Sequence, residues 1–261
     1  PQRLSQYAEG AKARGMALRV NLEIDVGLHR GGFADGAALA EALGLARAAG
    51  IEVTGLMGYE PHVPKMPDAD AAWADAQGAY AKAIAVLKAA GHDPARLTLN
   101  SAGSPTFRRH CQGTVANEVS VGSAFVKPGD FDYDDLADLT PAAFIATPVL
   151  KASADQPLPG IEALSGAMHW WDRNTTRGFF IHGGHWLAKP VSPAGLQYSR
   201  LMGRSSNQEL LTGSPRIDLK PDDTVFLRPD QSEALFLQFG DIAVYDGREI
   251  AELWPTLPVS A

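Results

Sequence analysis

The chain has 261 residues, 45% of them hydrophobic and 20% charged, which is the composition of a globular protein with a sizeable core. Its net charge of −7 argues against nucleic acids and anionic membranes as general partners. No apolar run approaches the roughly 20 residues that span a bilayer, no signal peptide is visible, and a single cysteine, Cys111, excludes an internal disulfide framework. We therefore expect a cytoplasmic protein that binds neither nucleic acid nor membrane.

Strand and helix patterns alternate in the first half of the chain. Runs rich in branched residues predict strands over residues 18–25, 51–58, 96–100 and 118–121. Apolar residues spaced three and four apart predict helices, each closed by a glycine, over residues 35–49 and 68–90. This alternation indicates parallel strands joined by right-handed crossovers, as in a β/α barrel.

The predicted fold class is a partial TIM-type β/α barrel followed by an all-β C-terminal domain. Four strands make half of an eight-stranded barrel, so we expect residues 1–135 to form a partial barrel whose N-terminal strands are missing from this sequence. From Pro141 on, short β-like runs punctuated by Pro and Gly predict a β-rich domain over residues 141–261. These runs are residues 143–151, 178–182, 224–227, 234–239, 241–245 and 250–254.

Small residues follow the third and fourth strands. Ser101, Gly103 and Ser104 come directly after one strand, and Gly122 with Ser123 closes the next. Where side chains are small, backbone N–H groups can approach an anion closely, and the hydroxyls add donors. Two such loops on adjacent strands predict a phosphate-binding cup, with two ordinary tight turns as the alternative.

The first two strands end in residues suited to recognising a ring or moving a proton. Arg30 follows Asp25 by five residues, and its guanidinium could bind a carboxylate or a phenolate, or pair with Asp25 to stabilise the loop. After the second strand, Tyr59 could hydrogen-bond a heteroaromatic ring, and His62 could serve as a base. A tyrosine that caps the core and a histidine on the surface are the alternative.

The second half of the chain carries three histidines, His169, His182 and His185, in an aromatic and glycine-rich region. Their spacing is not a recognised ligand pattern, and no cysteine or clustered carboxylate joins them, so we predict no metal site there. The sequence also lacks the Gly-Lys-Ser/Thr phosphate loop, the Gly-x-Ser-x-Gly elbow and the His-Glu-x-x-His helix, which argues against those enzyme classes.

Four motifs in order carry a resemblance to a known family. VNLEIDVGLHRGGF, GLMGYEPH, NSAGSPT and NEVSVGSAF, followed by a β-rich domain, resemble the fold-type III pyridoxal-phosphate (PLP) enzymes. Within that class the chain looks like the D-threonine aldolase and D-serine dehydratase group, with its alanine racemase-like barrel. The resemblance implies pyridoxal 5′-phosphate as cofactor, a small D-amino acid as substrate, and a homodimer with the site at its interface.

The resemblance also implies roles for individual residues. The cofactor-binding residues that it implies are Arg30, Tyr59, Ser101, Gly103, Ser104, Gly122 and Ser123. Tyr59 would lie against the pyridine ring, and the two small-residue loops would surround the phosphate. His62 would lie next to the substrate side chain, so that His62 and Tyr59 are the implied catalytic residues of this chain. Pro61 departs from the family motif, in which a glycine precedes the histidine.

Two further departures bear on the reaction. The usual positions for ligands of a divalent metal read Gln208, Gln231 and Glu233, and because Gln amides are weak ligands we expect no zinc site there. The family's lysine that binds the cofactor aldehyde lies in an Arg-Pro-His-x-Lys-Thr-like run, and none of the eight lysines of this chain stands in such a run. We therefore expect the catalytic lysine to lie outside this sequence, as part of a longer protein.

The predicted function is that of a PLP-dependent lyase acting on small D-3-hydroxy amino acids, of the D-threonine aldolase or D-serine dehydratase type. A PLP-dependent amino-acid racemase is the alternative within the same fold. A non-catalytic PLP-binding protein is a second alternative, which the altered metal positions favour. A third is a subunit that pairs with another chain carrying the missing strands.

Overall fold

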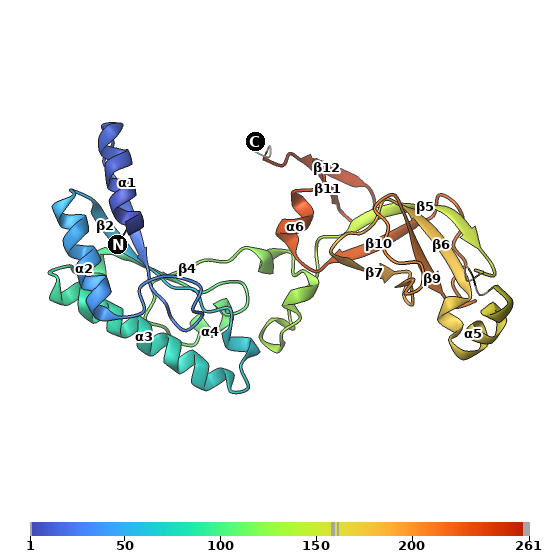
Figure 1. Ribbon diagram of the computed structural model, residues 1–261, viewed down its shortest axis with the longest axis horizontal. Helices are drawn as coiled ribbons and strands as arrows, with labels where there is room; N and C mark the ends of the chain where they lie inside the picture. Colours follow the sequence, from blue (N-terminus) through green and yellow to red (C-terminus); the bar gives the residue numbers. More distant parts are fainter. Residues whose placement is uncertain (1, 158–159, 161, 258–261) are drawn as a thin grey trace. The chain divides into compact units, whose positions relative to one another are not determined.

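The computed structural model describes residues 2–157, 160 and 162–257, and the chain divides into two compact units (Figure 1). Unit 1 comprises Pro1–Ala124 and Tyr133–Asp138, and unit 2 comprises Phe125–Asp132 and Leu139–Ala261. The domain limits expected from the sequence, 1–135 and 141–261, stay a prediction. Within the described part of the chain, no helix is both long and apolar enough to cross a membrane.

Unit 1 alternates helices with the strands of one parallel sheet. Its α-helices are α1 (Gln2–Ala13), α2 (Gly36–Ala48), α3 (Ala69–Ala89) and α4 (Phe107–His110). Its strands, hydrogen-bonded in chain order and parallel throughout, are β1 (Arg19–Glu23), β2 (Glu52–Met57), β3 (Thr98–Ser101) and β4 (Glu118–Val119). Short 3-10 helices are η1 (Val63–Lys65), η2 (Pro94–Arg96), η3 (Ser123–Phe125) and η5 (Asp134–Leu136). The predicted half of a β/α barrel is confirmed.

The two long helices of unit 1 begin and end where the sequence signals them. Asp35 caps α2 by accepting a hydrogen bond from the Ala38 amide at 2.7 Å, and Asp68 caps α3 in the same way. Gly50 and Gly91 follow the helices with φ of 69° and 88°, a left-handed conformation that costs glycine little. Because each helix ends here, the chain turns back to the sheet, and the next strand runs parallel to the one before it.

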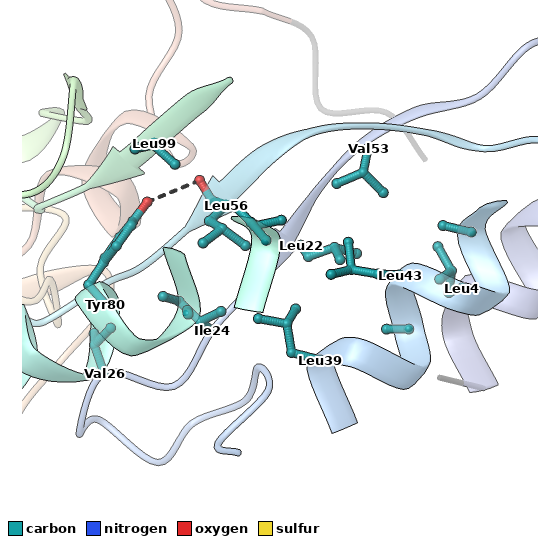
Figure 2. Close-up of a cluster of buried hydrophobic side chains, with 14 of the residues drawn as sticks. Leu4, Leu22, Ile24, Val26, Leu39, Leu43, Val53, Leu56, Tyr80 and Leu99 are labelled. Atoms are coloured by element: carbon teal, nitrogen blue, oxygen red, sulfur yellow. Dashed lines mark hydrogen bonds between the residues drawn. The ribbon is translucent and has the colours of Figure 1, made fainter. Parts of the chain in front are cut away.

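The core of unit 1 lies between the sheet and its helices. Leu22 and Ile24 from the β1 region pack with Leu39 and Leu43 of α2, and Leu56 of β2 is fully buried beside them (Figure 2). Burying an aliphatic side chain of this size contributes about 1.5–3 kcal/mol. This core therefore fixes the sheet whose strand ends carry the candidate site.

Tyr80 of α3 is the one polar side chain placed deep in this core among the residues drawn in Figure 2. Its hydroxyl donates toward the carbonyl oxygens of Asn100, at 2.8 Å, and Leu56, at 3.3 Å. Burial raises the pKa of the Tyr80 hydroxyl, with help from the nearby charges of Glu60 and Glu118, so it stays a donor at all physiological pH values. The helix is thereby joined to the backbone of two strands.

Tyr80→Phe is expected to lower the free energy of unfolding of unit 1 by about 0.5–1.5 kcal/mol, because it removes a buried hydrogen bond to the Asn100 carbonyl oxygen, which keeps the Gly58 amide as its other donor. Urea unfolding followed by far-ultraviolet circular dichroism measures the change. Tyr7→Phe removes a hydroxyl from a side chain that is 57% exposed and is the matched control, with no expected effect. Equal stability of the two variants would contradict the assigned role of the Tyr80 hydroxyl.

Unit 2 is built mainly of antiparallel strands. A six-stranded sheet has the order β7-β10-β5-β6-β9-β8, and a separate hairpin pairs β11 with β12. The strands are β5 (Ile145–Ser153), β6 (Arg177–His182), β7 (Ala188–Ser192), β8 (Gln197–Tyr198), β9 (Gln208–Gly213), β10 (Thr224–Pro229), β11 (Ile242–Tyr245) and β12 (Ile250–Trp254). The helices are α5 (Ser165–Trp171), α6 (Ser232–Phe236), η4 (Gly129–Phe131), η6 (Glu162–Leu164) and η7 (Arg173–Thr175). The predicted β-rich second half is confirmed.

One predicted strand of unit 2 is wrong. Residues 234–239 were expected to be extended, but α6 runs through the first part of this segment and buries Leu235. Glu, Ala and Leu are good helix formers, and a short apolar run does not distinguish strand from helix by its periodicity. The strands β7, β8 and β9 were not anticipated, because Pro190 interrupts the first and the second has only two residues.

Arg228 of β10 holds the first segment of unit 2 in place. Its guanidinium pairs with both carboxylate oxygens of Asp132, at 2.7 and 2.9 Å, and donates to the carbonyl oxygens of Lys127 and Pro128. The hydrogen bonds from Arg228 lower the pKa of the Asp132 carboxyl. This fork ties residues 125–132 to a strand about a hundred positions further along the chain.

Candidate active site

The candidate site lies at the carboxyl ends of β1, β2, β3 and β4. Because these strands are parallel and adjacent, the four loops that follow them leave the sheet at one edge. We call them the β1 loop (residues 24–33), the β2 loop (58–63), the β3 loop (102–106) and the β4 loop (120–124). Every residue singled out in the first half of the sequence for a cofactor or catalytic role lies in one of these loops or, for Ser101, at the last position of β3.

Asp25 shapes the β1 loop. One oxygen of its carboxylate accepts from the backbone amides of Gly27, at 2.9 Å, and His29, at 3.0 Å, and the other contacts His29 Nδ1 at 2.8 Å. Burial acts to raise the pKa of Asp25, but the hydrogen bonds from His29 and Gly27 prevail and lower it. The partner of Asp25 is therefore His29 and not Arg30, so the loop-stabilising pair considered for Arg30 does not form.

Arg30 instead lies over the ring of Tyr59. Its guanidinium carbon is 4.6 Å from the ring centroid, a distance typical of a cation–π contact. The other neighbour of the ring is Gly103, where a Cβ atom would come within 2.3 Å of a Tyr59 ring carbon. The ring is thus confined between the β1 and β3 loops, and only glycine fits beside it.

A small pocket opens between the β1 loop and Tyr59. Its lining residues are Glu23, Ile24, Asp25, Val26, Leu28, Arg30, Gly31 and Tyr59. The pocket joins two of the predicted site residues, Arg30 and Tyr59, with two carboxylates that the sequence reading did not assign to the site, Glu23 and Asp25. No lysine is among the residues that line it.

His62 lies at the end of the β2 loop, where η1 begins. Its Nδ1 atom is buried and has no hydrogen-bond partner among the described residues. Its Nε2 atom is close to Gly27, since a Cβ atom at that glycine would lie 2.9 Å from it. With φ of 112°, Gly27 has a backbone conformation that favours glycine and leaves room for the imidazole. His62 is therefore next to the β1 loop, with one buried ring nitrogen that no described residue satisfies.

Ser104 connects the β3 and β4 loops. Its hydroxyl oxygen accepts from the backbone amides of Gly122, at 3.2 Å, and Ala124, at 2.9 Å. Both amides are thus engaged by Ser104, which fixes the β4 loop against the β3 loop. A Cβ atom at Gly122 would meet nothing within 4 Å, so open space lies beside this loop. Ser123 is buried between the two donors.

Ser101 has a different neighbour. Its hydroxyl donates to the Glu60 carboxylate at 2.9 Å, so its proton is directed toward the β2 loop. Glu60 was not singled out by the sequence reading, although it stands directly between Tyr59 and Pro61. Two more donors to the same carboxylate were also missed, Thr106 at 2.8 Å and His110 at 3.1 Å. Glu60 is fully buried, and this cluster lies directly behind the predicted site.

The positions compared with metal ligands lie in unit 2 and have partners of their own. Gln208 accepts from Lys151 at 3.0 Å, Gln231 donates to Asp130 at 3.3 Å, and Glu233 accepts from Ser232 at 3.1 Å. Among the described residues, no three His, Cys, Asp or Glu side chains come together in a way that could hold a metal ion.

Comparison with known proteins identifies the fold. Residues 1–128 match the family model of the alanine racemase N-terminal domain. The crystal structure of D-threonine aldolase from Filomicrobium marinum superposes with a TM-score of 0.74 at 21% identity, over 97% of this chain and 67% of that one. D-threo-3-hydroxyaspartate dehydratase from Delftia sp. HT23 gives 0.71 at 15% identity, over 97% and 69%. Alanine racemase from Bacillus anthracis, with bound L-Ala-P, gives 0.61 at 14% identity, over 85% and 58%.

The chain therefore has the fold of the fold-type III pyridoxal-phosphate enzymes, an alanine racemase-like α/β unit followed by a β-rich unit. This confirms the resemblance that the four motifs indicate. Its first half matches the alanine racemase N-terminal domain family, and the aldolase and the dehydratase are similar to it over nearly its whole length. Comparison with curated protein sequences gives no match.

The residues of the site fit a flat ring that carries a phosphate. The Tyr59 ring lies between the Arg30 guanidinium and Gly103. The β4 loop, whose Gly122 and Ala124 amides donate to Ser104, lies beside open space. An unpartnered buried nitrogen of His62 adds one polar atom that a ligand could satisfy. Such a set places an aromatic ring and a positive charge near a loop of small residues, features that suit a phosphorylated pyridine ring.

Proposed function

We propose that this protein binds pyridoxal 5′-phosphate at the carboxyl ends of β1–β4 and acts as a lyase on small D-3-hydroxy amino acids, of the D-threonine aldolase or D-serine dehydratase type. The observation that carries the proposal is the meeting of ring-binding and anion-binding features around Tyr59. Arg30 lies over the ring, Gly103 abuts it, and Ser104 links the β3 loop to the converging amides. Similarity to an aldolase and a dehydratase supports the choice of reaction.

Different residues of this chain would orient the cofactor ring and bind its phosphate. In our proposal, Tyr59 and Arg30 set the position of the ring, and the loops containing Ser101, Gly103, Ser104, Gly122 and Ser123 hold the phosphate. When bound, the cofactor supplies an electron sink for negative charge at the substrate α-carbon. His62 lies at the side of the β1 loop, where an imidazole can accept or return a proton at a ring nitrogen.

A racemase is the second candidate, and the match of residues 1–128 to the alanine racemase N-terminal domain favours it. The two candidates differ in the bond that breaks, since racemisation returns the α-proton and leaves the side chain in place. A non-catalytic PLP-binding protein is the third, and the amide side chains at Gln208 and Gln231 favour that reading. The homodimer, the D-amino-acid substrate and the cytoplasmic location stay predictions.

The test is an assay of the purified chain with pyridoxal 5′-phosphate and three D-amino acids. Retro-aldol cleavage of D-threonine releases glycine and acetaldehyde, dehydration of D-serine releases pyruvate and ammonia, and racemisation of D-alanine gives L-alanine. Each reaction is followed with and without Mn²⁺. Borohydride reduction followed by peptide mapping shows whether the cofactor is attached to one of the eight lysines.

The products and the site of cofactor attachment separate these readings. Lyase products from D-3-hydroxy amino acids support the proposal, and L-alanine as the product replaces it with the racemase. Cofactor binding without turnover supports the non-catalytic protein, or a lysine supplied from outside this chain if peptide mapping finds none attached. No measurable binding of the cofactor to the folded chain would overturn the assignment of the site.

A further inference from the structure

Glu60 is a fully buried carboxylate that the binding roles proposed above do not use. Its Oε2 atom accepts from the Ser101 hydroxyl, and its Oε1 atom accepts from the Thr106 hydroxyl and contacts His110 Nε2. Buried carboxylates are rare unless donors surround them, because an unpaired charge is costly in the protein interior. Three side-chain donors on one carboxylate therefore indicate a fixed arrangement.

Two of the donors to Glu60, Ser101 and Thr106, lie at the two ends of the β3 loop. Ser101 stands at the end of β3, just before this loop, and Thr106 is its last residue, so both ends of the segment are held by one carboxylate. Gly103, which abuts the Tyr59 ring, and Ser104, which reaches the β4 loop, lie between them. Since Glu60 follows Tyr59 directly in the chain, the carboxylate joins the ring-binding β2 loop to the anion-binding β3 loop.

We infer that Glu60 is a positioning residue that fixes the distance between the ring-binding and phosphate-binding halves of the site, so that one phosphorylated pyridine engages both at once. The inference rests on the proposed cofactor site and assigns a role to a side chain that would not itself touch the cofactor. A clamp of this kind raises affinity by preorganisation, because neither loop needs to be ordered when the ligand binds. The clamp should raise the affinity for a ligand in which the ring and the phosphate are joined. Phosphate alone or the ring alone needs only one half of the site, so the clamp should affect their binding little.

Hydrogen bonds keep Glu60 ionised despite its burial. Burial acts to raise its pKa, and the hydrogen bonds from His110, Thr106 and Ser101 lower it by more, so the net shift is downward. The ionisable groups near it are His110 from α4, which contacts it, and Tyr80 from α3, whose hydroxyl pKa the Glu60 charge helps to raise. An anion accepts stronger hydrogen bonds than a neutral amide, which is why the glutamine variant is informative.

The experiment measures dissociation constants for three probes on the wild-type chain and on Glu60→Gln. The probes are pyridoxine 5′-phosphate, which has the ring and the phosphate but no aldehyde to react with surface lysines, and its two parts, pyridoxine and inorganic phosphate. Glu209→Gln is the matched control, since Glu209 is another fully buried carboxylate, which accepts from the His185 amide and from Arg204 in unit 2. Hydrogen exchange of the β2 and β3 loops is recorded for all three proteins without ligand.

In Glu60→Gln, the affinity for pyridoxine 5′-phosphate is expected to fall about tenfold or more, while the affinities for the two parts change by less than about threefold. Exchange in the β3 loop is expected to rise, and Glu209→Gln is expected to match the wild type in both measurements. An unchanged affinity for the linked probe would overturn the inference. So would an equal loss for all three probes, which is the result of a merely structural role.

Failure of the proposed function gives a separate result. If the wild-type chain binds pyridoxine 5′-phosphate no better than its parts, the assigned cofactor site is wrong. Hydrogen exchange in the β3 loop then decides whether Glu60 holds the β2 and β3 loops together. Faster exchange in the β3 loop of Glu60→Gln, but not of Glu209→Gln, supports Glu60 as the clamp between the two loops. Unchanged exchange in that loop overturns it.

Discussion

Gly103→Ala is expected to weaken binding of pyridoxine 5′-phosphate about 10- to 100-fold, the equivalent of about 1.4–2.8 kcal/mol of overpacking beside the ligand. The added Cβ atom would lie 2.3 Å from one Tyr59 ring carbon and 3.0 Å from another, inside van der Waals contact. The ring must then move away from the β3 loop, which disturbs its contact with Arg30 of the β1 loop at 4.6 Å. Fluorescence titration with the aldehyde-free probe measures the effect.

The matched control for Gly103→Ala is Gly78→Ala in α3. A Cβ atom at Gly78 meets nothing within 4 Å, and alanine in a helix is about 1 kcal/mol more favourable than glycine, so binding is expected to stay unchanged. The stability cost of Gly103→Ala, about 1–3 kcal/mol for overpacking, should shrink when Tyr59→Leu removes the ring. Wild-type affinity in Gly103→Ala would show that the position of the Tyr59 ring does not matter for the ligand.

Glu60→Ala is expected to lower the free energy of unfolding of unit 1 by about 3–5 kcal/mol at neutral pH. The substitution removes the acceptor that Ser101, Thr106 and His110 share and opens a cavity among them. Urea unfolding followed by circular dichroism reports chiefly on unit 1, which contains the long helices α2 and α3. Glu41→Gln, at an exposed site of α2, is the control, with an expected change within about 0.5 kcal/mol.

The loss in free energy of unfolding caused by removing Glu60 should become smaller as the pH falls. Because the folded-state pKa of Glu60 is lowered, its contribution is fully present above the usual glutamate pKa of about 4.3 and is lost as the pH falls through the lower value. The stability gap between the wild type and Glu60→Gln should therefore narrow below about pH 4.3. Other acidic groups are common to both proteins and cancel in the difference. A gap that stays constant down to acid unfolding would mean that Glu60 is not ionised in the fold.

The fold was largely predictable because its signals are local. Glycines at 50 and 91 end two helices whose apolar spacing is regular, and the strands between them are rich in branched residues. In unit 2 the signals are weaker. Segment 208–213 was missed because its residues are nearly all buried and so show no alternation, and segment 234–239 was read as a strand although α6 covers its first three residues.

The candidate site was predictable only as separate pieces. Arg30, Tyr59 and Gly103 could each be picked out as following the end of a strand, but their contacts join residues 29 and 44 positions apart, and no local pattern encodes them. Glu60 was overlooked because a glutamate beside a proline reads as a solvated loop residue, and glutamate is almost never fully buried unless it is paired. Its donors are 41 to 50 residues away, so the pairing is visible only in three dimensions.

The two stretches between residues 125 and 138 belong to different units, and this limits how the protein can be divided. A cut after residue 124 would leave residues 133–138, whose Asp135 and Asp138 pair with Arg109 and Arg108 of α4, on the wrong fragment. A cut after residue 138 would instead separate residues 125–132 from Arg228. No single break in this region yields two complete units, so limited proteolysis here should loosen at least one of them, and fragment exchange between homologues would need two junctions.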